Sequence, residues 1–344
     1  MANKLAVCPL RVAFDLDRNF QSLRRPSIAA VLGTIVHETT EAAAKQRVWP
    51  DDQASRRAQI EGLWAQRENG GRAALEKAWS PAVPPLLTDW PGYEMKRVQT
   101  VRRILRSLPA MTDNASTPDQ SQRKNIVEER IDDAVSGLFG WPDRVEVVGD
   151  SYRVVDLKTG SDQEEPTDAQ RRQLILYAVL VHRKYRQWPI ALEIQDIAGN
   201  RRPVAYRPLD AESALREVED WITEFNQAIT EGRVRSLAHP GPDQCRSCPY
   251  RVVCSSYWKN LLSQWNHQSV LGRIITSRTL GQLTQLAIEV VSPLDRRSQI
   301  IQVTGLELED APGSFIYASI TDLSGSWPRE NLHGRWSTMT RLWK

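Results

Sequence analysis

The sequence predicts an α/β protein in which helices flank a central mixed sheet, followed by a small all-β domain. Three observations support this fold class. The first is a β-hairpin within residues 140–160, where two valine-rich strands surround a turn at Gly149-Asp150-Ser151. The second is a helical pattern at 168–186 followed by two further strands within 189–208. The third is a series of short strand-like segments within 265–344, separated by Gly, Pro and Asp.

Composition sets the broad class of the protein. The chain has 344 residues and 41% hydrophobic residues, which is enough for one large or two modest globular domains. It contains no apolar run of the ~20 residues that a transmembrane helix needs, and the first residues lack a signal-peptide layout. We therefore expect a soluble cytoplasmic protein without a membrane partner. A net charge of only +3 gives no global attraction for a polyanion, although recurring Arg-Arg pairs offer local phosphate contacts or solvated helix faces.

The hairpin carries charged residues where a core is expected. Apolar residues at 154, 155 and 157 predict that its second strand is buried on both faces. Asp156 and Lys158 nevertheless share one face of this strand, because side chains two residues apart point the same way. Asp143 enters from the start of the partner strand. Buried carboxylates need compensation, and a divalent cation would supply it.

These letters and their spacing resemble a known family. Asp143, twelve intervening residues and then Asp156-x-Lys158 resemble the metal-site pattern of the PD-(D/E)XK nucleases. The surrounding G-x-x-D-R and V-D-L-K-T-G letters resemble the RecB/AddB branch, which includes the RecB-like CRISPR adaptation nuclease. The resemblance implies a restriction-endonuclease-like nuclease domain over 1–262, with a helical insertion at 46–122.

Two elements upstream of the hairpin extend the resemblance. A helix is expected from Pro26 to about Lys45, and it places Gly33 and His37 one turn apart. In the family, this G-x3-H element supplies a histidine ligand of the catalytic metal; otherwise His37 packs or faces water. A strand is expected at 126–131, where Glu128 would bind a second metal, orient a water, or simply be exposed.

The region between these two elements is expected to be helical. Residues 50–108 show breaks at Gly70-Gly71 and at 81–87, and residues 109–122 look like a loop. The spacing of Trp64, Leu75 and Trp79 predicts a stripe that faces the core rather than a platform for bases.

The helix after the hairpin carries the next match. Asp168 is the expected N-cap of this helix, which runs to about Arg186. Gln173 and Tyr177 lie one turn apart on it and resemble the Q-x3-Y element of the family. The resemblance implies that this pair supports the active site and contacts the DNA strand. A further amphipathic helix is expected from Asp210 to about Glu231.

The four cysteines predict a metal centre. A cytoplasmic protein uses cysteines for metal more often than for disulfides. The set has one remote N-terminal member and a C-x2-C-x5-C cluster, namely Cys8, Cys245, Cys248 and Cys254. This layout resembles the iron-staple nucleases, in which a [4Fe–4S] cluster clips the two ends of the nuclease domain together. Structural Zn²⁺ is the alternative, although only one C-x2-C pair is present.

Residues 265–344 lie beyond the family match and are expected to form five short strands in a small OB-like barrel. Trp327, Trp336 and Phe315 would stack single-stranded nucleic acid there; a partner-docking module or structural cap is the alternative. The sequence has no G-x4-G-K-[ST] motif, so any helicase motor would come from a partner protein.

The resemblance implies hydrolysis of DNA phosphodiester bonds, by an exonuclease or end-processing enzyme acting on single-stranded DNA. Asp143 and Asp156 would bind Mg²⁺ or Mn²⁺ together with His37 and the Leu157 carbonyl. Lys158 would orient the nucleophile and stabilise the transition state. The context would be DNA repair, recombination, or CRISPR and phage defence.

Several alternatives remain open from the sequence. The second hypothesis is a catalytically silent scaffold that binds DNA ends or a helicase, and the third is a zinc-bound nucleic-acid-binding protein. Arg144 would contact a phosphate or form an ion pair. Trp141-Pro142 precedes Asp143 where relatives place other residues, so the metal ligand would be Asp132 or Asp133 if Asp143 is displaced.

Overall fold

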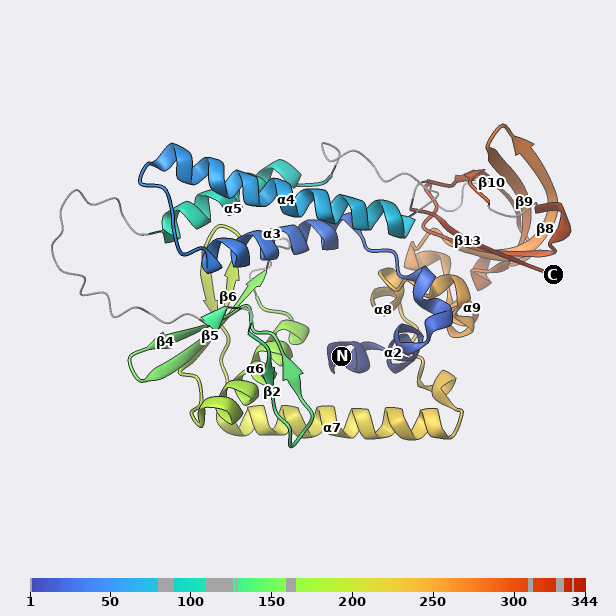
Figure 1. Cartoon of the computed structure of the whole chain (residues 1–344). Helices are drawn as coiled ribbons and strands as arrows, with labels where there is room; N and C mark the ends of the chain where they lie inside the picture. Colours follow the sequence, from blue (N-terminus) through green and yellow to red (C-terminus); the bar gives the residue numbers. More distant parts are fainter. Residues whose placement is uncertain are drawn as a thin grey trace. The chain divides into compact units, whose positions relative to one another are not determined.

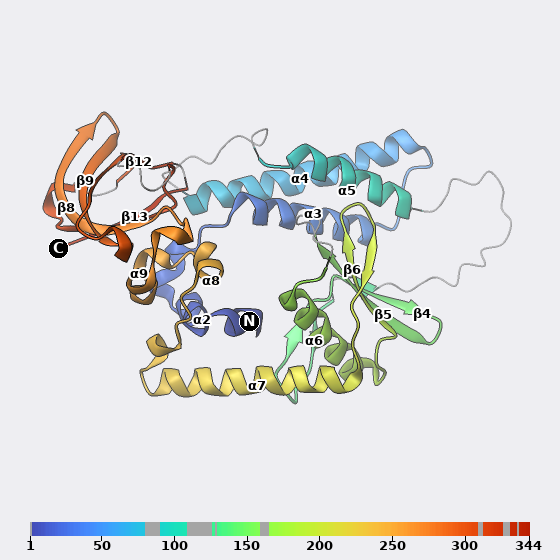
Figure 2. The ribbon, with the colours of Figure 1, turned by 180° about the vertical axis from the view of Figure 1, so that it is seen from behind.

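The computed structural model describes residues 2–79, 90–108, 126–127, 129–158, 165–308, 312–325, 331–335 and 337–344. The whole chain is drawn from two opposite sides in Figures 1 and 2. It divides into two compact units. The first unit comprises Met1–Arg25, Glu76–Pro85 and Thr223–Lys344, and the second comprises Pro26–Leu75 and Leu86–Ile222. No helix among the described residues is long and apolar enough to cross a membrane.

Three helices form one layer of the second unit. They are α3 (Ile28–Lys45), α4 (Gln53–Trp79) and α5 (Tyr93–Ser107), and they run side by side (Figure 1). The side chain of Ser27 accepts a hydrogen bond from the amide of Ala30, which caps the start of α3.

The expected break at Gly70-Gly71 is wrong, because α4 continues through both residues. A Cβ atom at Gly71 would lie 3.0 Å from Val31 Cγ1, so glycine here serves the close approach of α4 to α3. Trp64 and Leu75 are buried, as the stripe predicted. The Trp79 side chain, the expected break at 81–87 and the loop at 109–122 lie outside the described residues.

A mixed sheet forms the centre of the second unit. Five described strands pair in the order β1-β4-β5-β6-β7. Their bounds are β1 (Ile126–Val127), β4 (Arg144–Val148), β5 (Ser151–Lys158), β6 (Ala191–Asp196) and β7 (Arg201–Pro203). The predicted hairpin is confirmed, because β4 and β5 pair antiparallel from Val148↔Ser151 to Arg144↔Val155. The next pair, β5 and β6, is parallel, and α6 (Asp168–Tyr185) makes the crossover between them.

Two details of this region differ from expectation. The strand expected at 126–131 is divided, since β1 joins the central sheet while β2 (Ile131–Asp132) pairs with β3 (Phe139–Gly140). Thr167, not Asp168, caps α6, because its hydroxyl accepts from the amide of Gln170 while the Gln170 side chain accepts from the amide of Thr167. This reciprocal capping box is the more specific signal.

The two faces of the sheet have different chemistry. One face packs against α6, where Val154 and Leu192 of the strands lie in a core cluster with Leu174. The opposite face carries Glu146, which is buried and bonded to Arg201 at 2.7 Å. Apolar residues 154, 155 and 157 of β5 are all buried, so burial of this strand on both faces is confirmed.

The first unit combines both ends of the chain. Helices α1 (Ala2–Val7) and α2 (Pro9–Leu16) lie at its N-terminal end. The long helix α7 (Pro208–Thr230) enters this unit from the other one. The cysteine segment contributes α8 (Pro242–Arg246) and α9 (Ser255–Asn260). The unit also contains short 3-10 helices: η1 (Arg18–Leu23), η3 (Val234–Leu237), η4 (Arg251–Val253), η5 (Ser263–Trp265), η6 (Leu294–Arg296) and η7 (Pro312–Ser314).

The C-terminal region is a β-sheet, as expected, but its strand order is not that of a closed barrel. Six described strands pair in the order β12-β10-β9-β8-β11-β13. Their bounds are β8 (Val270–Leu280), β9 (Leu283–Ser292), β10 (Ile300–Leu306), β11 (Tyr317–Thr321), β12 (Asn331–His333) and β13 (Met339–Trp343). The sequence missed β12, which is very short and pairs parallel with β10. Among the described residues the end strands β12 and β13 do not pair, so the sheet stays open. Phe315 is half-buried, and Trp327 and Trp336 lie outside the described residues.

This sheet packs on the cysteine segment. Arg251 Nη2 donates to Asp322 Oδ1 at 2.6 Å, and the Ser319 hydroxyl donates to the Val252 carbonyl at 2.8 Å. The Ser292 hydroxyl donates to the Trp258 carbonyl at 2.8 Å. The strands and the cysteine segment therefore belong to one compact unit.

Candidate active site and cysteine cavity

Asp143 lies where the β4–β5 ladder ends. The last backbone pair of the ladder is Arg144↔Val155. Beyond it, the amide of Leu157 donates to Asp143 Oδ2 at 2.6 Å, so a side chain replaces the missing strand partner. The other oxygen, Oδ1, lies 3.5 Å from His37 Nδ1 on α3. The helix and the strand thereby hold one carboxylate between them.

Asp156 and Lys158 form an ion pair on the α6 face of β5. Lys158 Nζ lies 2.6 Å from Asp156 Oδ2, and the Asp156 residue is only 2% exposed. Burial, together with the nearby charge of Asp143, raises the pKa of Asp156 to about 6, although Lys158 opposes this shift. Two carboxylates thus lie close together in a poorly solvated place, which favours binding of a cation.

The predicted Gln173–Tyr177 pair continues from the lysine. Lys158 Nζ donates to Gln173 Oε1 at 3.2 Å, and Gln173 Nε2 donates to the Tyr177 hydroxyl at 3.0 Å. The capping box stabilises the first turn of α6, so Gln173 and Tyr177 project from a well-defined helical backbone.

Gly140 makes room for this arrangement. A Cβ atom at Gly140 would lie 2.8 Å from Tyr177 Cε1, closer than real Cβ contacts allow. The glycine of the G-x-x-D-R letters therefore lets β3 reach the tyrosine ring. The sequence pattern contained this glycine but gave no role for it.

The proline before Asp143 does not displace the aspartate. Asp143, rather than Asp132 or Asp133, approaches both His37 and β5. Asp132 pairs with Arg130 at 2.7 Å, and Asp133 accepts a hydrogen bond from the Ser136 hydroxyl at 2.6 Å.

Two arginines lie beside the carboxylates. Arg144 Nε lies 3.1 Å from Glu146 Oε1, and its Nη2 donates to Gln195 at 2.9 Å, so the structure shows the ion pair considered for this residue. The second is Arg103 on α5, which donates to the Thr40 hydroxyl on α3. Burial lowers the pKa of Arg103 to about 10, with a further lowering from Arg144 that Asp143 partly opposes. The sequence marked Arg103 only as a member of one of the recurring Arg-Arg pairs and did not connect it with Asp143, because that proximity depends on the packing of α5 on α3.

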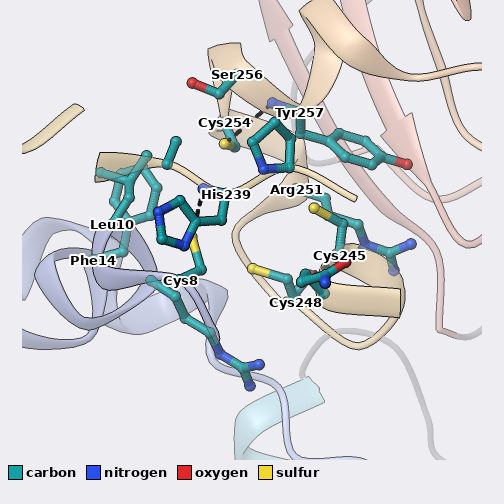
Figure 3. A pocket seen from close by; sticks show the side chains of 14 residues that line it. Cys8, Leu10, Phe14, His239, Cys245, Cys248, Arg251, Cys254, Ser256 and Tyr257 are labelled. Carbon is teal, nitrogen blue, oxygen red and sulfur yellow. Dashed lines mark hydrogen bonds between the residues drawn. The ribbon is translucent and has the colours of Figure 1, made fainter. Parts of the chain in front are cut away.

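The four cysteines line one cavity in the first unit. Figure 3 shows Cys8 from the start of α2 facing the other three, which come from the segment containing α8 and α9. Cys8 precedes Pro9 at the start of α2, and Cys254 is the N-cap of α9. The rest of the lining includes Arg11, Phe14 and Tyr257.

The environment of the sulfur atoms suits thiolates held by a cation. The amide of His239 donates to Cys8 Sγ at 3.5 Å, and the amide of Tyr257 donates to Cys254 Sγ at 3.4 Å. Burial raises the pKa of Cys248 to about 11, while the charge of Arg11 acts in the opposite direction. The thiol of Cys248 would therefore stay protonated unless a metal displaced the proton. As the side chains stand, no three His, Cys, Asp or Glu residues in the described part of the chain are grouped closely enough to hold a metal ion.

Comparison with protein families agrees with the geometry. Residues 2–255 match the family model described as the PD-(D/E)XK nuclease superfamily. The chain belongs to the PD-(D/E)XK nuclease superfamily. Membership implies a metal-dependent hydrolase of phosphodiester bonds with a nucleic-acid substrate. A comparison with curated proteins gave no match.

Most of the site residues predicted from the sequence of this nuclease lie in the second unit. His37 contacts Asp143, and Asp156 is linked through Lys158 and Gln173 to Tyr177. The two groups are joined by the charge of Asp143 acting on Asp156 and by the bond from the Leu157 amide to Asp143. Glu128 lies outside the described residues, and so do Thr159 and Gly160 of the V-D-L-K-T-G letters. The four cysteines form a separate set in the first unit.

Proposed function

We propose that this chain is a Mg²⁺- or Mn²⁺-dependent deoxyribonuclease of the RecB/AddB-like branch, acting on the ends of single-stranded DNA. One observation carries the proposal: Asp143 stands between His37 and the amide of Leu157, beside the buried pair of Asp156 and Lys158. A purely structural salt bridge between Asp156 and Lys158 would not need the carboxylate of Asp143 nearby, because that charge raises the pKa of Asp156.

The donor atoms are of the types that a hard divalent ion takes, and the side chains would have to draw closer together to hold it. Asp143 and Asp156 supply carboxylate oxygens, His37 supplies an imidazole nitrogen, and the Leu157 carbonyl is the fourth ligand we propose. The imidazole favours Mn²⁺ over Mg²⁺. A cation would also stabilise the ionised form of Asp156, whose pKa is raised by burial and by Asp143. When bound, the ion would polarise the phosphoryl oxygen and lower the pKa of a water molecule.

The other residues act around the scissile phosphate. Lys158, held by Asp156 and by Gln173, would orient the attacking water and stabilise the charge of the transition state. Gln173 and Tyr177 would position the DNA strand, and Arg144 would attract a phosphate from its place beside Asp143. Glu128 remains the candidate for a second metal ligand or for orienting water.

For the cysteine cavity we propose a [4Fe–4S] cluster with a structural role. Four sulfur side chains, amide donors to two of them and the nearby Arg11 support four thiolates around a cationic centre. A cluster here would join α2 to the segment after α7, closing a loop of more than two hundred residues. Zn²⁺ is the alternative occupant, and iron and zinc analysis separates the two.

We place the enzyme in the cytoplasm, in DNA repair, recombination, or CRISPR or phage defence. Its exonuclease or end-processing activity would require single strands, which a helicase partner would supply. The open C-terminal sheet is the candidate surface for that partner or for nucleic acid.

The first experiment is cleavage of end-labelled single-stranded DNA with Mn²⁺ and with Mg²⁺. Wild type is compared with Asp156→Ala and Lys158→Ala, with Asp150→Ala in the exposed hairpin turn as the control. We expect both site variants to lose at least about 100-fold in rate, the usual effect of removing a group that stabilises transition-state charge, and the control to cleave normally.

Duplexes and flaps are tested in parallel, because end-processing enzymes differ in the structure they cut. If correctly folded protein cleaves none of these substrates with either metal, the nuclease proposal fails. A scaffold that binds DNA ends or a helicase would then be the better account.

A further inference from the structure

Two exposed aromatic rings stand immediately before Asp143. Phe139 is 52% exposed and Trp141 is 48% exposed. Their ring centroids lie 5.5 Å apart, with an interplanar angle of 88°. Single exposed aromatic side chains are common on protein surfaces; here two exposed rings lie in contact with each other.

An arginine completes this pair. The guanidinium of Arg130 lies 4.6 Å from the Phe139 centroid and 5.5 Å from the Trp141 centroid. An ion pair with Asp132 at 2.7 Å holds Arg130 in place. The aromatic platform, defined as Arg130, Phe139 and Trp141, therefore combines two exposed, mutually perpendicular rings with a guanidinium whose charge is shared with Asp132.

Its place in the chain ties the platform to the proposed catalytic carboxylate. Phe139 belongs to β3, and the next residue, Gly140, packs against Tyr177. Trp141 is two residues before Asp143, a span of at most ~7 Å of extended chain. Pro142 restricts Trp141 to extended backbone conformations and so limits its movement. A strand bound at Asp143 would therefore pass close to the platform.

We propose that the aromatic platform stacks an unpaired base of the substrate strand next to the cleaved phosphate. The inference rests on the proposed nuclease function and names the way in which the site would select single strands. Aromatic rings bind the faces of all four bases, and the arginine adds attraction for the phosphate backbone. Bases within a duplex are already stacked and paired, so they cannot enter such a platform without unpairing.

The test combines protein variants with substrates that lack bases. Both oligonucleotides are single-stranded. One carries all of its bases, and the other has abasic sites flanking the cleaved bond. Wild type, Phe139→Ala, Trp141→Ala and the double variant are compared for binding by fluorescence anisotropy and for cleavage. Trp221→Ala is the matched control, because Trp221 also carries an arginine, Arg172 at 5.1 Å, but lies on α7.

We expect the double variant to bind the normal oligonucleotide about 5- to 150-fold more weakly than wild type does, the range for loss of one stacked base. On the abasic oligonucleotide the double variant should bind almost as tightly as wild type does. The base that the rings would stack is already absent there, so removing the rings costs little more. Trp221→Ala should resemble wild type on both substrates.

Equal losses on the two oligonucleotides would overturn the inference, because the rings would then act on the strand independently of its bases. The two proposals fail separately. If wild type cleaves DNA but the ring substitutions weaken binding of both oligonucleotides equally, the nuclease proposal stands and the platform is rejected. If the ring substitutions weaken binding only when the bases are present and no substrate is cleaved, the platform stands and the nuclease proposal is rejected.

Discussion

The amide of Leu157 donates a 2.6 Å hydrogen bond to the carboxylate of Asp143 at the point where the backbone ladder between their strands has ended. This contact fixes one oxygen of the carboxylate and leaves the other directed at His37, 3.5 Å away. The proposed metal ligand is therefore oriented by the protein before any ion arrives, which lowers the cost of ordering it on binding.

Replacing Asp143 with Asn should separate orientation from charge. The amide oxygen of Asn can still accept from Leu157, so the melting temperature should change little. Cleavage should fall at least about 100-fold, because the ion contributes several kcal/mol to the transition state and loses a charged ligand. Initial rates across a Mn²⁺ titration measure this, with Asp150→Asn as the control. Wild-type rates at low Mn²⁺ would contradict the assignment.

Gly140→Ala should disturb the site through Tyr177. The added methyl would meet the tyrosine ring at 2.8 Å, so either β3 or the ring must move. We expect a loss of about 1–3 kcal/mol in stability, typical of overpacking, and a lower cleavage rate. The control is Gly62→Ala in α4, where nothing lies within 4 Å of the added atom. Equal behaviour of the two variants in thermal melts and cleavage assays would show that Tyr177 tolerates displacement.

Glu146 should make stability depend on pH. Burial raises its pKa, but the hydrogen bond from Arg201 and the charges of the neighbouring arginines outweigh burial and hold the pKa below the usual 4.5. A lowered folded-state pKa stabilises the protein above the unfolded pKa and loses this effect as pH falls through the folded value. Glu146→Gln should therefore cost about 3 kcal/mol at pH 7 and progressively less below about pH 4.

Chemical denaturation at pH 7 and pH 3 measures the Glu146 effect, with exposed Glu224→Gln as the control. A cost that stays constant between the two pH values would show that packing, rather than charge, is lost.

Arg103 should contribute to binding of the DNA strand. Its guanidinium is held beside Asp143 and Arg144, so it adds positive charge next to the proposed metal site. Arg103→Ala should weaken binding of single-stranded DNA and reduce the slope of log K against log salt by about 0.7. Arg102→Ala, which removes an exposed neighbour, is the control. An unchanged salt slope would assign Arg103 a purely structural role through its bond to Thr40.

Loss of one cysteine should release the proposed cluster. In Cys8→Ser we expect iron to fall from about four atoms per chain towards none, since a cubane cluster needs four protein ligands. Ser256→Ala, another change in the lining of the cavity, should retain iron. Iron, sulfide and zinc analysis of anaerobically purified protein measures the outcome. Wild-type protein that contains one zinc and no iron would replace the cluster with a zinc site.

Local patterns predicted much of the second unit. The hairpin, the helix at 168–186 and the pairing of Asp156 with Lys158 follow from alternation and spacing within a few residues. His37 and Asp143 are over one hundred residues apart, and it was the resemblance to a nuclease family, rather than periodicity, that linked them. The structure places their side chains 3.5 Å apart.

What the sequence could not give depends on tertiary packing. The continuity of α4 through Gly70-Gly71 reflects the close approach of α3, which overrides a local glycine signal. Arg103 reaches the site only through the contact of α5 with α3. The open order of the C-terminal strands follows from pairing between segments far apart in the chain, for which strand propensity carries no information.

The composition of the cysteine cavity has a consequence for how the protein is made. Cys8 leaves the ribosome more than two hundred residues before Cys245, which is tens of seconds at ~5–20 residues per second. Residues 26–222 include the whole carboxylate site and are complete during that interval. The proposed nuclease centre can therefore fold on the nascent chain before the other three cysteines of the cavity have been synthesised. Completion of the cavity must then await Cys245, Cys248 and Cys254, and until they are made the thiol of Cys8 is open to oxidation.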